Sequence, residues 1–107
     1  MAVIGKDKNV FTVIIEIDVD KDIADKYQEI SMEWVPFFAN QPGFISQTNH
    51  RSHDDTKFIT YLQWETEQDH LNCKNSGDMD PESDFMKLLT SGKIRMIDRT
   101  YDVVYSS

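Results

Sequence analysis

Trp64 and His70 have the residue types and the spacing of a small pocket that moves a proton. Trp64 closes a run of β-branched and aromatic residues, and His70 follows it by six positions in a segment with helix-start chemistry. Thr60 stands four residues before Trp64, so the two share one face of an alternating strand, over which the next helix can place His70. An imidazole moves protons near neutral pH, and a hydroxyl binds a substrate oxygen. The catalytic candidates are therefore His70, Trp64 and Thr60.

An apolar lining would make that chemistry effective, and the neighbouring sequence supplies one. The substrate-binding candidates are Phe44, Phe58 and Leu62, which together with the tryptophan would exclude water and strengthen the remaining polar contacts. A plainer interpretation of the same residues is that Trp64 packs in the core and that His70 is a surface helix residue. The position of the two rings in the structure decides between these interpretations.

Other chemistry finds little support in the spacing of the residues. His50, His53 and His70 are too scattered for a zinc site, and Cys73 is the single cysteine of the chain. The sequence also has no glycine-rich loop that would cradle a phosphate, and no dinucleotide-binding fingerprint. We therefore expect no metal ion and no bound cofactor.

The elements that must position these residues follow from hydrophobic periodicity. Val10–Val19 is rich in β-branched residues, which predicts a strand. Apolar residues then recur every three or four positions from Ile23 to Phe38, which predicts an amphipathic helix that ends near Ala39 and is bent or tightened at Pro36. The later predicted elements are strands over Phe44–Arg51, Lys57–Glu65 and Lys93–Tyr105, a short helix from Thr66, and a helical turn or two around Phe85–Leu89.

The order of these elements is strand, helix, strand, strand, helix, strand. This is the split βαβ arrangement of a ferredoxin-like sandwich, an α+β fold with a four-stranded antiparallel sheet. The 107 residues suit one domain over 1–107, because a single core typically serves ~100 to 150 residues.

Helices cover only one face of such a sheet, so the other face must be polar or find a partner. Both faces of the first and third strands carry hydrophobic side chains. An unpaired face of this composition would be a larger apolar patch than monomers usually tolerate, which predicts a homodimer. The predicted interface residues are Phe11, Val13, Ile15, Ile17, Ile59, Tyr61 and Tyr101.

Charge and composition limit the classes of binding partner and the cellular compartment that we expect. The chain has 11 Lys and Arg against 19 Asp and Glu, which gives a formal net charge of -8. Such a chain repels phosphate backbones and anionic lipid surfaces, so nucleic acid and membrane are not expected partners. The single cysteine, the absence of a signal-peptide pattern in the sequence and the absence of an apolar run of about 20 residues lead us to expect a cytoplasmic protein.

Three stretches of the sequence resemble one known family. They are Gln41-Pro-Gly-Phe44 after the first helix, then His50-Arg-Ser, then Thr60-Tyr-Leu-Gln-Trp-Glu-Thr-Glu67 followed by His70. Together they are similar to the antibiotic biosynthesis monooxygenase family of dimeric α+β barrels, over roughly Val10 to Cys73 by motif and over the whole chain by element order. The resemblance implies a ferredoxin-like protomer, pairing of two sheets across a two-fold axis, and a pocket between sheet and helices.

The best-understood members of this family are cofactor-free oxygenases of aromatic polyketides. Their pocket is lined by an Asn four residues before a Trp, by that Trp, and often by a Tyr six residues after it; the resemblance carries these positions to Thr60, Trp64 and His70. Haem-degrading relatives use a histidine ten residues after the Trp, and this position is Lys74 here. The resemblance thus implies a cofactor-independent monooxygenase of a small aromatic or quinol-like substrate, which serves as its own reductant. The alternatives are a non-catalytic small-molecule-binding protein, or an isomerase or haem-degrading relative.

Overall fold

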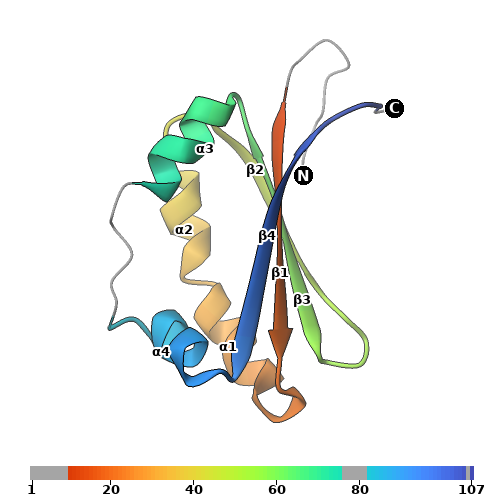
Figure 1. Cartoon of the computed structure of the whole chain (residues 1–107), viewed down its shortest axis with the longest axis vertical. Coiled ribbons are helices and arrows are strands. Elements are labelled where there is room, and N and C mark those ends of the chain that lie inside the picture. The colour runs from red at the N-terminus through yellow and green to blue at the C-terminus, as the bar shows by residue number, and fades with distance from the viewer. Residues whose placement is uncertain (1–9, 76–81, 106) are drawn as a thin grey trace.

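The computed structural model describes residues 10–75, 82–105 and 107 (Figure 1). Its elements in chain order are β1 (Phe11–Val19), the 3₁₀ turn η1 (Lys21–Ile23), α1 (Ala24–Ser31), α2 (Trp34–Ala39), β2 (Phe44–Arg51), β3 (Lys57–Trp64), α3 (Glu67–Lys74), α4 (Asp84–Ser91) and β4 (Ile94–Asp102). In Figure 1 the helices of the described residues all lie on one face of the sheet. The described residues therefore form two layers, and none of their helices lies over the second face of the sheet.

The four strands form one antiparallel sheet in the order β2-β3-β1-β4. β1 is central: its Phe11 lies opposite Trp64 of β3 on one side and opposite Asp102 of β4 on the other. This strand order, together with the helical layer on one face, confirms the α+β ferredoxin-like fold. Two strands end earlier than the sequence predicts, β3 at Trp64 and β4 at Asp102.

The predicted first helix is interrupted, although not at its proline. α1 ends at Ser31 and α2 begins at Trp34. Across this break the amides of Glu33 and Val35 donate to carbonyls three residues earlier, which is the tighter 3₁₀ pattern. The break puts Pro36 in the first turn of α2, where a missing N–H costs little because first-turn amides have no partner within their own helix. The interruption therefore lies before Pro36 rather than at it.

Two hydrophobic clusters fill the space between the sheet and the helices. The first cluster includes Ile17, Tyr27, Phe58, Phe85 and Ile94. The second cluster contains Val13, Leu62, Trp64 and Cys73. Ile15 packs against both clusters. The helix-facing side of β1 thus joins the two halves of the core.

Part of the predicted dimer interface was wrong. The antiparallel register pairs the odd-numbered residues of β1 with the even-numbered residues of β3, and both sets face the helices. The residues that lie on this inner side are Phe11, Val13, Ile15 and Ile17. The open face carries Thr12, Ile14, Glu16 and Asp18 of β1, in register with Ile59, Tyr61 and Tyr101. β1 is apolar on both sides, so the two charged residues at its end were the signal for its outer face.

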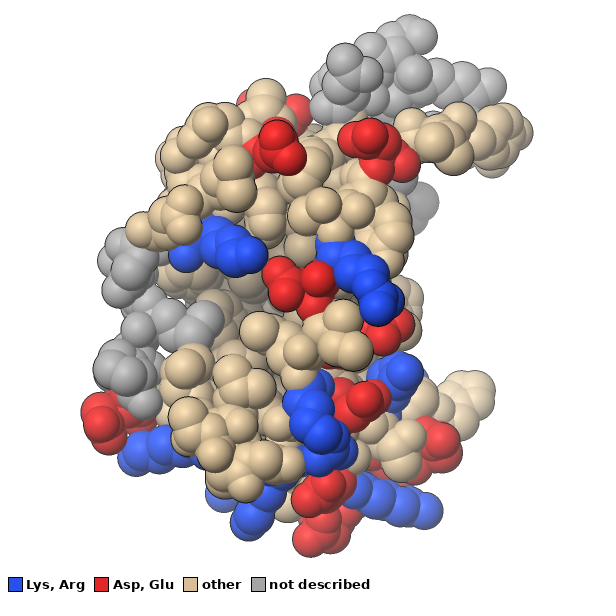
Figure 2. Space-filling model, in the orientation of Figure 1, with Lys and Arg blue, Asp and Glu red and all other residues tan. Residues whose placement is uncertain are grey.

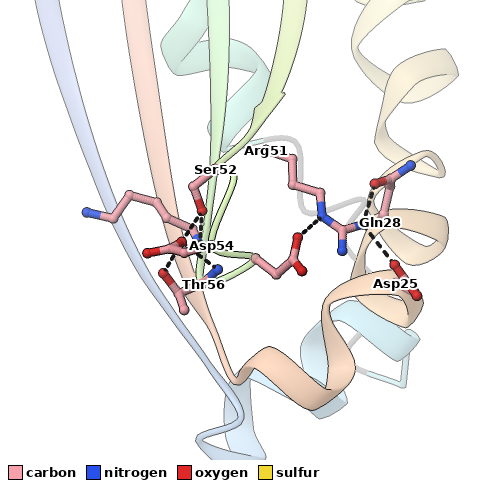
Figure 3. A network of polar contacts seen from close by, with 8 residues as sticks. Asp25, Gln28, Arg51, Ser52, Asp54 and Thr56 are labelled. Atoms are coloured by element: carbon pink, nitrogen blue, oxygen red, sulfur yellow. Dashed lines mark hydrogen bonds and ion pairs between the residues drawn. The ribbon is translucent and has the colours of Figure 1, made fainter.

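Arg51, at the end of β2, fastens this edge strand to the helical layer (Figure 3). Its guanidinium lies 2.9 Å from the Asp25 carboxylate and donates to the Gln28 side-chain oxygen at 2.8 Å, both on α1. It also donates to Asp55 in the hairpin turn at 3.0 Å, and it lies over the Phe58 ring, 5.5 Å from the ring centre. These contacts hold the far end of β2 against α1.

Asp54 holds the turn between β2 and β3 in shape. Its carboxylate accepts hydrogen bonds from the hydroxyls of Thr56 and Ser52, each at 2.7 Å (Figure 3). The bond from Thr56, followed by the bond from Ser52, lowers the pKa of Asp54 to about 2. The carboxylate therefore stays ionised, and keeps these bonds, down to strongly acidic pH.

Charged side chains are mixed by sign on the face seen in Figure 2. Lys and Arg are interspersed there with Asp and Glu, rather than gathered into one basic or acidic area. No helix in the described part of the chain is long and apolar enough to cross a membrane.

Candidate functional site

A cavity of about 290 Å³ lies between the sheet and the helices. All four strands and the four α-helices contribute to its walls, which are mostly apolar. The volume is at the lower end of the ~300 to 1,000 Å³ typical of small-molecule sites. Trp34 and Trp64, the two tryptophans of the chain, both line it. The cavity thus suits a small and largely apolar ligand.

Trp64 forms a rigid, fully buried wall of this cavity. Its exposed fraction is 0%, and its ring lies edge-on to those of Phe38 and Phe44, at centroid distances of 6.3 Å and 5.9 Å. Its indole N–H has no hydrogen-bond partner among the described residues. Buried polar groups are nearly always hydrogen-bonded. The N–H is therefore a buried donor to which the described residues offer no acceptor.

Gly43 explains why the Pro-Gly-Phe turn sits beside this wall. Its φ is +81°, in the left-handed region, and a Cβ there would overlap the side chain of Asp69 on α3. Its carbonyl accepts a hydrogen bond from the Glu65 amide at 2.8 Å. Glycine thus lets the start of β2 approach the start of α3 closely, which seats Phe44 against Trp64.

The start of α3 places His70 over the sheet. Thr66 caps the helix, and its hydroxyl oxygen accepts from the Asp69 amide at 3.1 Å. One turn into the helix, the imidazole of His70 lies 6.2 Å from the Trp64 ring and 5.5 Å from the Phe11 ring, measured between centroids. The side chain also lines the cavity. α3 therefore folds His70 over Trp64, as the sequence predicts. The plainer interpretation holds for Trp64, which packs in the core, but not for His70, which is partly buried against two rings.

The surroundings of His70 keep its imidazole neutral. Burial lowers the pKa of His70 below its ordinary value, and the charge of Lys74 lowers it further. The carboxylates of Asp98 and Glu67 act in the opposite direction but do not outweigh burial. At pH 7 the ring is therefore unprotonated and able to accept a proton.

The predicted site residues divide into two groups. Thr60, Leu62, Trp64 and His70 all line the cavity. Phe44 lies behind Trp64 and supports it without being part of the lining. Phe58 belongs to the core, 4.8 Å from the Tyr27 ring centre, and it does not line the cavity. The structure thus brings the three catalytic candidates together and leaves two of the three substrate-binding candidates outside the walls.

Sequence reasoning missed an ion pair in the lining. The Nζ of Lys74 lies 3.8 Å from Oδ2 of Asp98, and both residues border the cavity. The sequence contains a pattern that would have predicted the position of each of these two residues. Lys74 follows His70 by one helical turn, and Asp98 continues the inward-facing alternation of Ile94 and Met96 on β4. The pair forms a charged edge on an otherwise apolar cavity.

Gln47 is a further polar residue of the lining that the sequence pattern hid. A β-bulge interrupts the pairing of β2 with β3 between Phe44 and Ser46. Regular alternation from Phe44 would turn Gln47 outward, but the extra residue reverses the alternation and places Gln47 opposite Leu62, on the cavity side. Without the bulge, the same strand would present Ser46 to the cavity.

The described part of the chain contains no group of three or more His, Cys, Asp or Glu residues arranged to hold a metal ion. The titratable groups of the cavity are instead His70, Lys74, Asp98, Tyr27 and Cys73, spread over two helices and one strand. Burial raises the pKa of Tyr27 to about 12, so its hydroxyl stays protonated at neutral pH. Among these groups, His70 is the one whose pKa burial lowers.

Comparison with known proteins identifies the family. The sequence model of the antibiotic biosynthesis monooxygenases matches residues 10–80, more than half of the chain. The chain belongs to the antibiotic biosynthesis monooxygenase family. The resemblance seen in the sequence motifs is thereby confirmed. A relative in Streptomyces glaucescens, the tetracenomycin-F1 monooxygenase, is 23% identical over 97 residues, which cover 87% of this chain and 84% of that protein.

Solved structures of antibiotic biosynthesis monooxygenases have the same fold. SnoaB, a cofactor-independent oxygenase from Streptomyces nogalater, has a TM-score of 0.72 at 15% identity, covering 92% of this chain and 96% of its own. The ActVA-Orf6 monooxygenase of Streptomyces coelicolor, in complex with nanaomycin D, has a TM-score of 0.62 at 24% identity, covering 92% and 93%. At these identities the likeness establishes the fold.

Proposed function

We propose that the protein is a monooxygenase that oxidises a small aromatic or quinol-like substrate without a metal ion or an organic cofactor. The observation that carries this proposal is a neutral imidazole, that of His70, held against the Trp64 ring in an apolar cavity. Relatives support it by name: one is the tetracenomycin-F1 monooxygenase, one is a cofactor-independent oxygenase, and one is a monooxygenase that holds nanaomycin D.

In this mechanism neutral His70 takes a proton from a phenolic or enolic hydroxyl of the substrate. The resulting anion is electron-rich at carbon, and the substrate supplies all the electrons that oxygen accepts. A substrate CH2 group, or the CH2 of a phenol's keto form, becomes a carbonyl. One oxygen atom enters the new C=O bond, and the other leaves as water with two hydrogens. The proton on His70 returns when the O–O bond breaks.

The remaining lining residues hold the substrate anion and exclude water. The Trp64 N–H and the Thr60 hydroxyl are the donors available to its oxygen. The apolar walls keep bulk water away, which strengthens these contacts and protects the reactive anion from protonation. In this proposal, side chains of the protein itself donate the hydrogen bonds and exclude the water.

Oxygen uptake with hydroxynaphthalenes and hydroxyanthrones tests this function. We expect one O₂ consumed per substrate molecule and a quinone product, because the substrate is its own reductant. The measurement combines an oxygen electrode with mass spectrometry under isotopically labelled O₂, on protein treated with a metal chelator and freed of flavin. One labelled atom should enter the product. A compound that binds and is returned unchanged would overturn the oxygenase and leave a small-molecule-binding protein.

We further propose that the open face of the sheet is the interface of a homodimer. Its apolar residues are Ile14, Ile59, Tyr61, Ile97 and Tyr101. In the single chain Ile97 is 46% exposed and Tyr101 41% exposed, and no helix among the described residues covers them. Glu16 and Arg99 lie among these apolar residues on the same face. Exposed apolar residues with polar residues around them are typical of protein–protein interfaces, and most homo-oligomers are closed two-fold pairs.

Sedimentation at micromolar concentration should give ~25 kDa, twice the 12.5 kDa of the chain. Ile97→Lys should reduce this mass toward that of one chain, because it buries a charge in the interface. Leu71→Lys is the matched control, since Leu71 is also an exposed apolar residue, 37% exposed, but belongs to α3 in the helical layer. A wild-type protein that sediments as a monomer would contradict the proposed dimer.

We propose that the protein is cytoplasmic and that its partner, besides a second copy of the chain, is a small molecule. The net charge of -8 and the single cysteine, Cys73, motivate this placement. Both the compartment and the identity of the small molecule stay predictions.

A further inference from the structure

The inward position of Gln47 depends on the β-bulge in β2. Regular alternation along β2 would point the Gln47 side chain to the open face. The bulge between Phe44 and Ser46 places it on the cavity side instead. Bulges commonly re-aim a side chain next to an active site. Since Gln47 lies opposite Leu62, it is a diagonal neighbour of Thr60 and Trp64, at a Cα separation of about 7–8 Å. The residue therefore belongs to the same wall as two of the catalytic candidates.

The amide of Gln47 is oriented, and its oxygen is left without a partner. Its Nε2 donates to Oδ1 of Asn49 on the same strand at 3.1 Å, so the oxygen is the end of the amide that remains to be satisfied. Its Oε1 is buried and has no hydrogen-bond partner among the described residues. A buried carbonyl oxygen that accepts nothing is unfavourable, and few such groups persist in native structures. An acceptor held in this way in a cavity wall points to a donor on a ligand.

We propose that Gln47 is a specificity residue that accepts a hydrogen bond from a neutral hydroxyl on the ring of the substrate. This inference rests on the proposed function, because it takes the cavity to be the substrate site. The Trp64 N–H, also buried and unpartnered within the described residues, is the donor already assigned to the oxygen of the substrate anion. Gln47 therefore serves a second oxygen on the ring, whose hydrogen it accepts.

The proposal also fixes how many oxygens the substrate carries. An amide oxygen repels a phenolate, so the hydroxyl bound by Gln47 stays protonated and is not the one that His70 deprotonates. His70 comes from α3 and Gln47 from β2, so the two residues approach the ligand from the helical layer and from the sheet. The substrate class is therefore an aromatic compound with at least two ring oxygens, of which one is a hydroxyl.

A thermodynamic cycle measured by calorimetry tests the proposal. The probes are 1,5-dihydroxynaphthalene and its dimethyl ether, titrated without oxygen so that nothing is oxidised. The wild-type protein should prefer the diol, and in Gln47→Met this preference should shrink by about tenfold, the size expected for one buried neutral hydrogen bond. The contribution of His70 to diol binding is present in both proteins and cancels. Methionine is close to glutamine in size and accepts hydrogen bonds only weakly.

The control variant is Gln68→Met on α3. Its Nε2 also donates to an asparagine oxygen, that of Asn72 at 2.9 Å, but the pair is exposed and lies outside the cavity lining. Gln68→Met should leave the preference for the diol unchanged. Gln47→Met should unfold at a temperature no lower than the wild type, because it removes an unpartnered buried oxygen. This second readout also shows that the variant folds.

The outcomes separate this inference from the function on which it rests. A diol preference that persists in Gln47→Met would overturn the role of Gln47 while leaving the oxygenase in place. Equal binding of diol and ether by the wild type would have the same effect. If neither probe binds the wild type while oxygen uptake is seen with another aromatic substrate, Gln47 does not read a ring hydroxyl of this class. If no aromatic compound binds or reacts at all, the proposed function itself is wrong.

Discussion

Replacing His70 with alanine should lower the rate of oxygen uptake by about 100-fold or more, while leaving the oligomeric state and the unfolding temperature close to those of the wild type. The loss is that of a positioned general base, which typically contributes ~10²–10⁴-fold. The protein should stay folded because His70 is only partly buried at the edge of the Trp64 cluster. The measurement is the initial rate with the best substrate found by the electrode screen. His53→Ala, in the exposed hairpin turn, is the matched control and should keep full activity.

The same residue predicts the pH dependence of the rate. The base form of His70 is the neutral one, so kcat/KM should rise with pH through the pKa of the imidazole and then level off. Burial lowers that pKa below the ordinary 6.5, so the midpoint of the rise should lie below pH 6.5. In His70→Ala this rise should disappear. A variant with the wild-type rate and an unchanged pH profile would show that His70 only shapes the cavity.

Much of the fold was predictable because β1 and the helix after it have strong periodicity. Nine residues of β1 form a strand over Phe11–Val19, one residue shorter than the β-branched run that predicts it. The orientation of β1 was harder to predict. Its inner residues Val13, Ile15 and Ile17 alternate with Thr12 and Ile14, which are also uncharged, and the first charged residue on the outer face is Glu16. A strand that is apolar on both sides carries little information about its own orientation. That information comes from the register with β3, which is a property of two segments.

The candidate site was predictable where the chain is regular and hidden where it is not. β3 alternates without interruption, so Thr60, Leu62 and Trp64 fall on the inner face as their spacing predicts. β2 contains the bulge, so the inward position of Gln47 cannot be obtained by counting from Phe44. A single inserted residue in a strand exchanges its two faces, and propensities do not reveal it.

Replacing Trp64 with alanine should lower the free energy of unfolding by about 3–5 kcal/mol, the usual cost of truncating a large buried aromatic side chain. Trp64 is 0% exposed, and Phe38, Phe44 and His70 all pack on its ring. Its removal leaves a void that rigid neighbours on the sheet do not fill. Urea unfolding followed by far-ultraviolet circular dichroism measures the effect. Trp34→Ala, at a partly exposed position on α2, should lose less stability. A Trp64→Ala protein within about 1 kcal/mol of the wild type would contradict the central place of this ring in the core.

Trp64→Phe separates the packing of the ring from the chemistry of its N–H. Phenylalanine keeps an aromatic ring against Phe38 and Phe44, so most of the stability lost in Trp64→Ala should return. It has no N–H, so the unpartnered donor that the mechanism assigns to the substrate oxygen is gone. Turnover and affinity for a hydroxylated aromatic should therefore remain low in a protein that is stably folded. If Trp64→Phe recovers activity together with stability, the tryptophan acts through packing, and Thr60 is left as the donor to the substrate oxygen.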